Sequence, residues 1–347
     1  MTKSNPIEQV SVAGDGFTIG RGLGRAVAAT VRERVFVTPE FRELEKRWKG
    51  SERLRQLEAA ARRHFPEYVR EIEGLAAGAE LDFETLFLWN CRGDLRLPPD
   101  GAEAEGCTCV LLPAGEAPDD TAVIAHNEDG APEFLGHCSW VSVTPDVGPA
   151  FESFMYPGML PGHTFGVNAA GLVQTINNVR VHDLQVGVPR HVVTRAILGC
   201  ADIDDAVALL RRSDRASGFH HALGQAGSRR VISVEAPASG CHVNEISKPT
   251  AHANHLVYAD FDETPQEVTE SSELRQDRAA AMLANGGRDP EAVLFDNEAP
   301  VYRDNDDGDD YAQTLATGVF KLAADRVDWA VHANPSERNA LKGTIHV

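Results

Sequence analysis

The sequence changes its residue pattern once, close to residue 106, and this change limits the folds that the chain can adopt. Before it, apolar residues such as Phe41, Leu44 and Trp48 recur at helical spacing. The segment 97–106, LPPDGAEAEG, has no periodicity and predicts a loop. Helices are expected over about 39–65, with a break at 50–51, and over 66–77 and 82–89.

After residue 106 the pattern is that of strands. Short runs of β-branched or alternating residues are separated by Gly, Pro, Asn and Asp, and two helical stretches interrupt them at about 189–212 and 265–285. Helices on a core of antiparallel strands predict an α+β fold, with a mainly helical segment 1–106 and a strand-rich part 107–347. Strands are expected over 107–113, 121–129, 137–145, 163–168, 171–179, 229–236, 249–258 and 314–332.

A glycine-rich stretch near the start, GRGLG at 20–24, approaches the pattern of a nucleotide-binding loop. Arg25 stands where the GxGxxG pattern requires its third glycine. We therefore predict a turn at 20–24 and no nucleotide site.

The charge is strongly acidic, with 33 Lys and Arg against 52 Asp and Glu and a net charge of −19. Most of the excess lies in 107–347. It opposes binding to nucleic acid, which relies on basic side chains to neutralise phosphates, and it favours cationic ligands. The sequence has no apolar run of about 18 residues and no signal-peptide pattern at its start, so we expect a cytoplasmic protein without a membrane partner.

Six cysteines are spread along the chain without a C-x2-C pair. This spacing predicts neither a disulfide framework nor a zinc site, and we expect no metal and no cofactor. Each cysteine is by default a small buried hydrophobic residue unless its surroundings activate it. The six are Cys91, Cys107, Cys109, Cys138, Cys200 and Cys241.

Gly106-Cys107 stands out because it lies where the polar loop meets the first predicted strand. If the bond before Cys107 is cut, Cys107 becomes an N-terminus, and its own α-amine, with an ordinary pKa near 7.7–8.0, can serve as the base for its thiol. Gly106 suits such a bond, because a residue without a side chain lets the sulfur approach the carbonyl. The thiol can then attack the preceding carbonyl in an N→S acyl shift, and water hydrolyses the product.

Polar residues follow at the end of the second predicted strand, in AHNEDG (125–130). If the first two strands form a hairpin, this end lies beside the start of the first. Strand alternation places His126 and Glu128 on one face and Asn127 and Asp129 on the other. An acid at Asp129 can hold the new α-ammonium group, and the amides in NN (177–178) and HANH (252–255) can donate to an oxyanion.

These motifs, in this order, resemble the acyl-coenzyme A:6-aminopenicillanic acid acyltransferase family of N-terminal nucleophile (Ntn) hydrolases. The resemblance spans roughly residues 70–331 and implies a four-layer αββα sandwich that is made as a precursor and cleaves itself. Segment 1–106 would then be a small chain that accompanies the catalytic part, 107–347. The motifs are Gly-Cys-Thr at 106–108, HNED at 126–129, FGVNAAGLVQTINN at 165–178 and HANH at 252–255.

Carried over by position, the resemblance makes Cys107 the nucleophile and Gly106-Cys107 the processing site. Asp129 matches the acid near the cysteine, and Asn254 matches the amide that forms the oxyanion hole together with a backbone N–H. Asn177 or Asn178 matches a second amide, and His126 stands where relatives carry Gln or Arg. The residues expected to contact the substrate or the oxyanion are His126, Asn127, Asn177, Asn178 and His255.

The expected function is that of a self-processing cysteine amidohydrolase or acyltransferase, with an acyl-thioester on Cys107. Coenzyme A is a polyanion, so the acidic charge favours hydrolysis of a small amide, in particular one with a cationic amine. The alternatives are an acyl-CoA-dependent N-acyltransferase of the same family, a papain-like hydrolase with His255 as the base, a metal-dependent hydrolase, and a catalytically inactive binding or scaffold protein of the same fold. A metal held by His252 and His255 lacks a third clustered ligand. Cys109, on the same strand face as Cys107, is expected to be a core residue.

Overall fold

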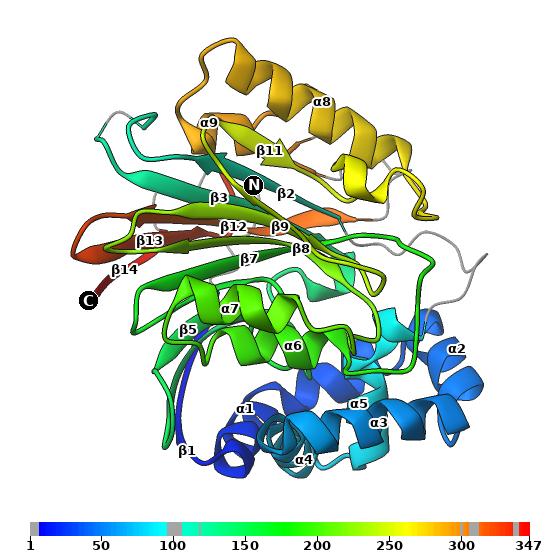
Figure 1. Ribbon diagram of the computed structural model, residues 1–347. Helices are drawn as coiled ribbons and strands as arrows, with labels where there is room; N and C mark the ends of the chain where they lie inside the picture. The colour runs from blue at the N-terminus through cyan, green and yellow to red at the C-terminus, as the bar shows by residue number, and fades with distance from the viewer. Residues whose placement is uncertain (1–6, 96–105, 118, 299–300, 305–311, 336–339) are drawn as a thin grey trace.

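The structure is a computed structural model that describes residues 7–95, 106–117, 119–298, 301–304, 312–335 and 340–347. Two β-sheets lie face to face, with helices on the outer face of each (Figure 1). In order across the first sheet lie β1 (Glu8–Gly14), β4 (Ser139–Pro145), β5 (Phe151–Met155), β6 (Phe165–Asn168), β7 (Leu172–Asn178), β8 (Phe219–Gln225), β9 (Val231–Ala236) and β10 (His242–Glu245). In order across the second lie β11 (Thr250–His252), β2 (Gly106–Leu112), β3 (Ala122–Gly130), β12 (Gln313–Leu322), β13 (Arg326–His332) and β14 (Leu341–His346).

Two pairs of helices complete the sandwich (Figure 1). On the second sheet lie α8 (Glu270–Ala284) and α9 (Pro290–Leu294), and their Leu283 and Val293 share an apolar cluster with Val110 and Ala125 of the sheet. On the first sheet lie α6 (Arg190–Ile197) and α7 (Ile203–Leu210). The predicted four-layer αββα sandwich is therefore confirmed.

Residues 7–95 form one strand and a group of helices beside α6 (Figure 1). The predicted helices are confirmed, including the break at Gly50, where Ser51 caps the next helix by accepting from the N–H of Leu54 at 3.1 Å. Strand β1 was not predicted; it pairs in parallel with β4 at the sheet edge. The helices of this part are α1 (Gly16–Thr30), α2 (Pro39–Trp48), α3 (Glu52–His64), α4 (Pro66–Ala79) and α5 (Phe83–Asn90), with short helical turns at η1 (Val31–Val35) and η2 (Arg92–Asp94). Two further short turns lie later in the chain, at η3 (Pro132–Phe134) and η4 (Ala259–Phe261).

The prediction of a turn at 20–24 is wrong, because these glycines lie inside α1. A Cβ atom at Gly20 would lie 1.9 Å from the carbonyl oxygen of Glu71, and one at Gly24 would lie 2.2 Å from that of Leu75. On α4, a Cβ at Gly74 would lie 2.2 Å from the carbonyl oxygen of Phe17. The glycines thus allow α1 and α4 to pack backbone against backbone, and their spacing of four residues serves helix packing.

Several strands differ from their predicted extent. The strand predicted over 249–258 is limited to 250–252, because the N–H groups of Val257 and Tyr258 donate to the carboxylate of Glu235 and do not enter a sheet. Strands β5, β8, β10 and β14 were not predicted; β8, with the sequence FHHALGQ, lacks the β-branched residues of a typical strand. Within the described residues, no helix is both long enough and apolar enough to cross a bilayer.

The β2–β3 hairpin positions the predicted site. Cys107 pairs with Glu128, and Cys109 pairs with His126, so these four side chains share the face that looks toward the other sheet. The opposite face, toward α8 and α9, carries Asp129 and its neighbours. The predicted alternation along 126–129 is therefore confirmed.

Candidate active site

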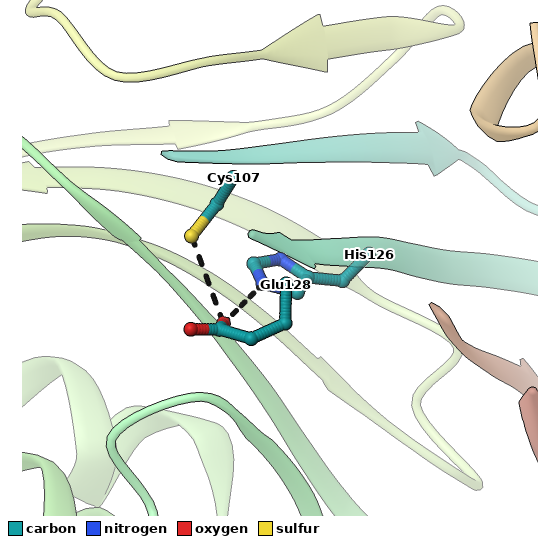
Figure 2. Close-up of side chains that lie close together, drawn as sticks. All are labelled: Cys107, His126 and Glu128. Carbon is teal, nitrogen blue, oxygen red and sulfur yellow. Dashed lines mark hydrogen bonds and ion pairs between the residues drawn. The ribbon is translucent and has the colours of Figure 1, made fainter. Parts of the chain in front are cut away.

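The side chain of Cys107 lies at the start of β2, buried between the two sheets, and points toward Glu128 (Figure 2). Its Sγ atom lies 3.6 Å from Oε2 of Glu128, which accepts the thiol hydrogen. A carboxylate thus stands directly beside the sulfur that the sequence assigns as nucleophile.

Two donors hold the carboxylate of Glu128. The hydroxyl of Tyr156 donates to Oε1 at 2.7 Å, and Nε2 of His126 lies 3.0 Å from Oε2. Burial lowers the pKa of His126 to about 3, so the imidazole is neutral at pH 7 and donates its Nε2–H to the carboxylate. These two contacts fix the orientation of the carboxylate at both oxygens.

The backbone of Cys107 is bound by residues far along the chain. Its N–H donates to Oδ1 of Asn254 at 2.9 Å, and its carbonyl oxygen accepts from Nη1 of Arg275 at 2.6 Å. Nη2 of Arg275 also donates to Oδ1 of Asn254, at 2.6 Å. Because two donors face Oδ1, the amide has one orientation, with Nδ2 donating to the carbonyl oxygen of Asn178 at 2.9 Å and its second hydrogen left for another acceptor.

Arg275 comes from α8 and is fully buried. Burial lowers its pKa to about 10, so the guanidinium remains charged at neutral pH. A buried positive charge therefore lies on the backbone of Cys107 and beside the amide of Asn254.

Asp129 lies beside Gly106, on the opposite face of the sheet from the sulfur. Its Oδ1 accepts from the hydroxyl of Thr314 at 2.7 Å, and its Oδ2 lies 3.9 Å from Nη1 of Arg303. A Cβ at Gly106 would lie 2.9 Å from that Nη1 and 3.3 Å from Oδ2 of Asp129. The space around Gly106 is thus filled by an ion pair, and a side chain there would have to displace it.

The other predicted residues have different partners. Asn177 accepts from Nδ1 of His220 at 3.1 Å, whereas Oδ1 of Asn178 accepts from Arg190 on the helical side at 2.8 Å. Asn127 donates to the carbonyl oxygens of Leu294 and Val301, and so ties β3 to the α9 region. Nδ1 of His255 lies 2.8 Å from the hydroxyl of Ser272.

The site therefore gathers Cys107, His126 and Asn254, with Gly106 and Asp129 behind the strand. Asn127, Asn177 and His255 bind other parts of the protein. Three contacting residues were not predicted, namely Glu128, Tyr156 and Arg275. Glu128 could have been found from its alternation with His126, but nothing in the local sequence of Tyr156 or Arg275 signals their place.

One group of side chains in the described residues has the arrangement of a metal site. The ligand atoms of Cys107, His126 and Glu128 all lie within 4.8 Å of one another. Thiolate, imidazole and carboxylate are the ligands that zinc takes in proteins. This group includes neither His252 nor His255, the pair considered from the sequence.

Cys241 is half-buried, and the other four cysteines are buried thiols with no activating charge beside them. Burial raises the pKa of Cys109 to about 12, and Cys109 belongs to the main apolar core, as predicted. Burial also raises the pKa of Cys91 and Cys138 well above the ordinary thiol value, and that of Cys200 to about 12. These thiols are therefore unreactive at neutral pH.

Comparison with known proteins shows the family of the chain. Residues 116–336 match the family described as acyl-coenzyme A:6-aminopenicillanic acid acyl-transferase. The chain belongs to this acyl-transferase family. It is also similar to the β-alanyl-dopamine/carcinine hydrolase of Drosophila melanogaster, with 26% identity over 93% of this chain and 92% of the relative.

Two solved structures are similar to this member of the acyl-transferase family. A conjugated bile acid hydrolase from Clostridium perfringens has 13% identity and a TM-score of 0.47, covering 70% of this chain and 92% of its own. A penicillin V acylase from Agrobacterium tumefaciens has 14% identity and a TM-score of 0.36, covering 71% and 80%. Membership of the acyl-transferase family makes the chain an enzyme that acts on amide carbon–nitrogen bonds, as a hydrolase or an acyltransferase.

Proposed function

We propose that this enzyme cleaves its own chain before Cys107 and then hydrolyses a small amide through an acyl-thioester on the Cys107 sulfur. The observation that carries the proposal is the set of contacts of Cys107. Its backbone N–H donates to Oδ1 of Asn254, and its sulfur points the other way, toward Glu128. The nitrogen that would become the α-amine already has an amide acceptor, in a buried position.

Self-cleavage begins with attack of the Cys107 sulfur on the carbonyl carbon of Gly106. The C–N bond breaks, the nitrogen of Cys107 takes a proton, and Gly106 is held as a thioester on the sulfur. Water then hydrolyses the thioester and leaves Gly106 with a carboxylate and Cys107 with a free amine and thiol. The products are the chains 1–106 and 107–347.

In the processed enzyme the α-amine of Cys107 acts as the base for its own thiol. The sulfur attacks the substrate carbonyl, and the free Nδ2 hydrogen of Asn254 stabilises the oxyanion. Asp129, beside Gly106, holds the new α-ammonium group. The amine product leaves, and water releases the acid.

The N-terminal chain is expected to stay bound after cleavage. Arg195 and Glu71 form a buried ion pair at 3.0 Å, and the N–H of Arg190 donates to Oδ1 of Asp94 at 3.2 Å. These contacts join segment 1–106 to α6, and breaking one would leave a charge buried without its partner.

The substrate class that we propose is an amide of a small amino acid, such as a β-alanyl amide. The hydrolase from Drosophila, which covers nearly the whole chain, takes its name from β-alanyl-dopamine. A net charge of −19 favours a cationic substrate and opposes coenzyme A as acyl donor. Water is thus the expected acyl acceptor.

A papain-like mechanism finds less support. In such a site one imidazole nitrogen faces the thiol and the other faces the acid. Here Nε2 of His126 faces the carboxylate of Glu128. Burial holds the pKa of this histidine at about 3. His255 binds Ser272.

The intact mass of the purified protein tests the proposal. We expect the 37.6 kDa chain to yield fragments of roughly 11–12 and 26 kDa, calculated from the mean residue mass, the larger beginning Cys-Thr-Cys-Val. Cys107→Ala should remain whole and inactive, and Cys109→Ala, on the same strand, should be cleaved as wild type. An uncleaved wild-type chain that turns over amides would overturn the mechanism.

A further inference from the structure

Resting on the proposed acyl-thioester mechanism, we propose that Glu128 binds the ammonium group of the acyl half of the substrate. The enzyme would thereby select amides of short amino acids over amides whose acyl group is uncharged. Glu128 is then the residue that determines specificity on the acyl side.

The distance between the sulfur and the carboxylate supports this assignment. The acyl carbon becomes bonded to Sγ of Cys107, which lies 3.6 Å from Oε2 of Glu128. An ammonium group on the second carbon beyond the carbonyl can therefore reach Oε2 at the length of a charge-assisted hydrogen bond, about 2.7–2.9 Å. An ammonium group at the end of a much longer chain extends beyond Oε2 and cannot make this hydrogen bond.

Acylation of the Cys107 sulfur removes one hydrogen-bond donor from Glu128. In the free enzyme the thiol of Cys107 donates to Oε2, and in the thioester the sulfur has no hydrogen to donate. An ammonium group on the acyl chain supplies a donor in its place. An alkyl group supplies none and must lie against a buried carboxylate, which is unfavourable.

Two side chains besides Cys107 contact the carboxylate of Glu128. The hydroxyl of Tyr156 donates to Oε1 at 2.7 Å, and Nε2 of His126 lies 3.0 Å from Oε2. They also fix its position before the substrate binds, so little ordering is needed on binding.

An aromatic ring lies beside Tyr156 and another lies beside His126, and such rings suit a small cation. The ring of Tyr156 lies 4.7 Å from that of Phe134, and the ring of His126 lies 5.7 Å from that of Phe165. Aromatic faces attract ammonium groups, most strongly where water is excluded. A carboxylate among aromatic rings is thus a suitable receptor for an alkylammonium group.

The experiment compares three para-nitroanilides with the same leaving amine, namely β-alanyl, butanoyl and ε-aminocaproyl. The β-alanyl and butanoyl groups have nearly the same shape and differ in the ammonium group. We expect wild type to prefer β-alanyl over each of the others by at least about 100-fold in kcat/KM. In Glu128→Gln the β-alanyl/butanoyl ratio should fall to within about 10-fold of one.

Glu152→Gln is the matched control, because Glu152 is a half-buried glutamate on β5 that binds Ser142 away from the site. Its ratio should equal that of wild type. Tyr156→Phe provides a second variant if Glu128→Gln fails to fold or to process, and it should lower the ratio about 10-fold by releasing one carboxylate oxygen.

The two proposals fail in different ways. If wild type processes itself but hydrolyses the butanoyl amide as well as the β-alanyl amide, or if Tyr156→Phe and Glu128→Gln keep the wild-type ratio, the role of Glu128 is wrong and the mechanism stands. If Cys107→Ala still turns over any of the three amides, the proposed function itself is wrong. Mass spectrometry of every variant shows which chain was assayed.

Discussion

His220 lies flat against His252, with ring centroids 3.5 Å apart and ring planes within 4° of parallel. Nε2 of His252 lies 2.8 Å from a carboxylate oxygen of Glu235, and Nδ1 lies 3.0 Å from the carbonyl oxygen of Ala253. Both ring nitrogens of His252 therefore lie within hydrogen-bond distance of a buried oxygen. Burial, together with the neighbouring histidines, holds the pKa of His220 well below its ordinary value, so this ring is neutral at pH 7.

This pair fixes the segment that carries Asn254. Glu235 accepts from His252 and from the N–H groups of Val257 and Tyr258, on both sides of Asn254 in the chain. The carboxylate thus holds the loop in the shape that brings the Asn254 amide to Cys107.

We expect Glu235→Gln to lower the free energy of unfolding by about 1–3 kcal/mol, because the glutamine has one acceptor oxygen in place of two and leaves a buried donor without a partner. Denaturant unfolding in a Cys107→Ala background measures this on a single chain. Self-cleavage of Glu235→Gln, in the background that retains Cys107, should also slow. The matched control is Glu245→Gln, whose exposed ion pair with Arg230 should contribute at most about 1 kcal/mol. Equal stability of the two variants would contradict the role of the pair.

The contact between α1 and α4 gives a second prediction. We expect Gly74→Ala to destabilise the protein by about 1–3 kcal/mol, because its Cβ would lie 2.2 Å from the backbone of Phe17. Alanine favours a helix over glycine by about 1 kcal/mol, so a stabilised variant would show that the helices separate freely. For the control, Gly22→Ala, the nearest atom is a side-chain methyl of Val12, and we expect tolerance. Denaturant unfolding measures both.

The sequence predicts the parts of the site that depend on local pattern. The hairpin alternation places Cys107 and His126 on one face and Asp129 on the other, and the order of the motifs brings Asn254 to the same site. The turn predicted at 20–24 is wrong because these glycines serve the close packing of α1 on α4, and the sequence of one helix does not show which helix packs against it.

The rest of the site depends on contacts that have no sequence pattern. Arg275 reaches the carbonyl oxygen of Cys107 from the outer helical layer, across 168 positions of sequence. Tyr156 reaches Glu128 from the loop after β5. Buried contacts of this kind depend on how the layers pack together, so they become recognisable only in the assembled fold.

Buried neutral histidines predict how stability depends on pH. Burial lowers the pKa values of His126, His163 and His221 to about 3, whereas a histidine in the unfolded chain titrates near 6.5. Between these values the unfolded chain binds protons that the folded chain does not. The free energy of unfolding is therefore retained above pH 6.5 and lost as the pH falls toward 3, by at most about 1.4 kcal/mol per pH unit for each histidine.

Denaturant unfolding of the Cys107→Ala chain at pH 7.5, 6.5 and 5.5 measures this dependence. His221→Gln should flatten the loss, while the exposed His346→Gln should not change it. A stability that is constant between pH 6.5 and 5.5 would contradict the neutral, buried state of these rings.

The cluster of Cys107, His126 and Glu128 predicts sensitivity to zinc. The three ligand atoms lie within 4.8 Å of one another, and a bound zinc ion would hold the sulfur as a thiolate ligand and remove it from attack. We expect micromolar Zn²⁺ to stop both self-cleavage and amide hydrolysis, and EDTA to restore them. Mg²⁺ and Ca²⁺ should have no effect, because they prefer oxygen ligands.

Co²⁺ provides a readout apart from activity, since its thiolate absorption should appear with wild type and Cys109→Ala but not with Cys107→Ala. His126→Ala should weaken the binding by at least about 10-fold through loss of one ligand. Inhibition of equal strength in His126→Ala would place the zinc elsewhere.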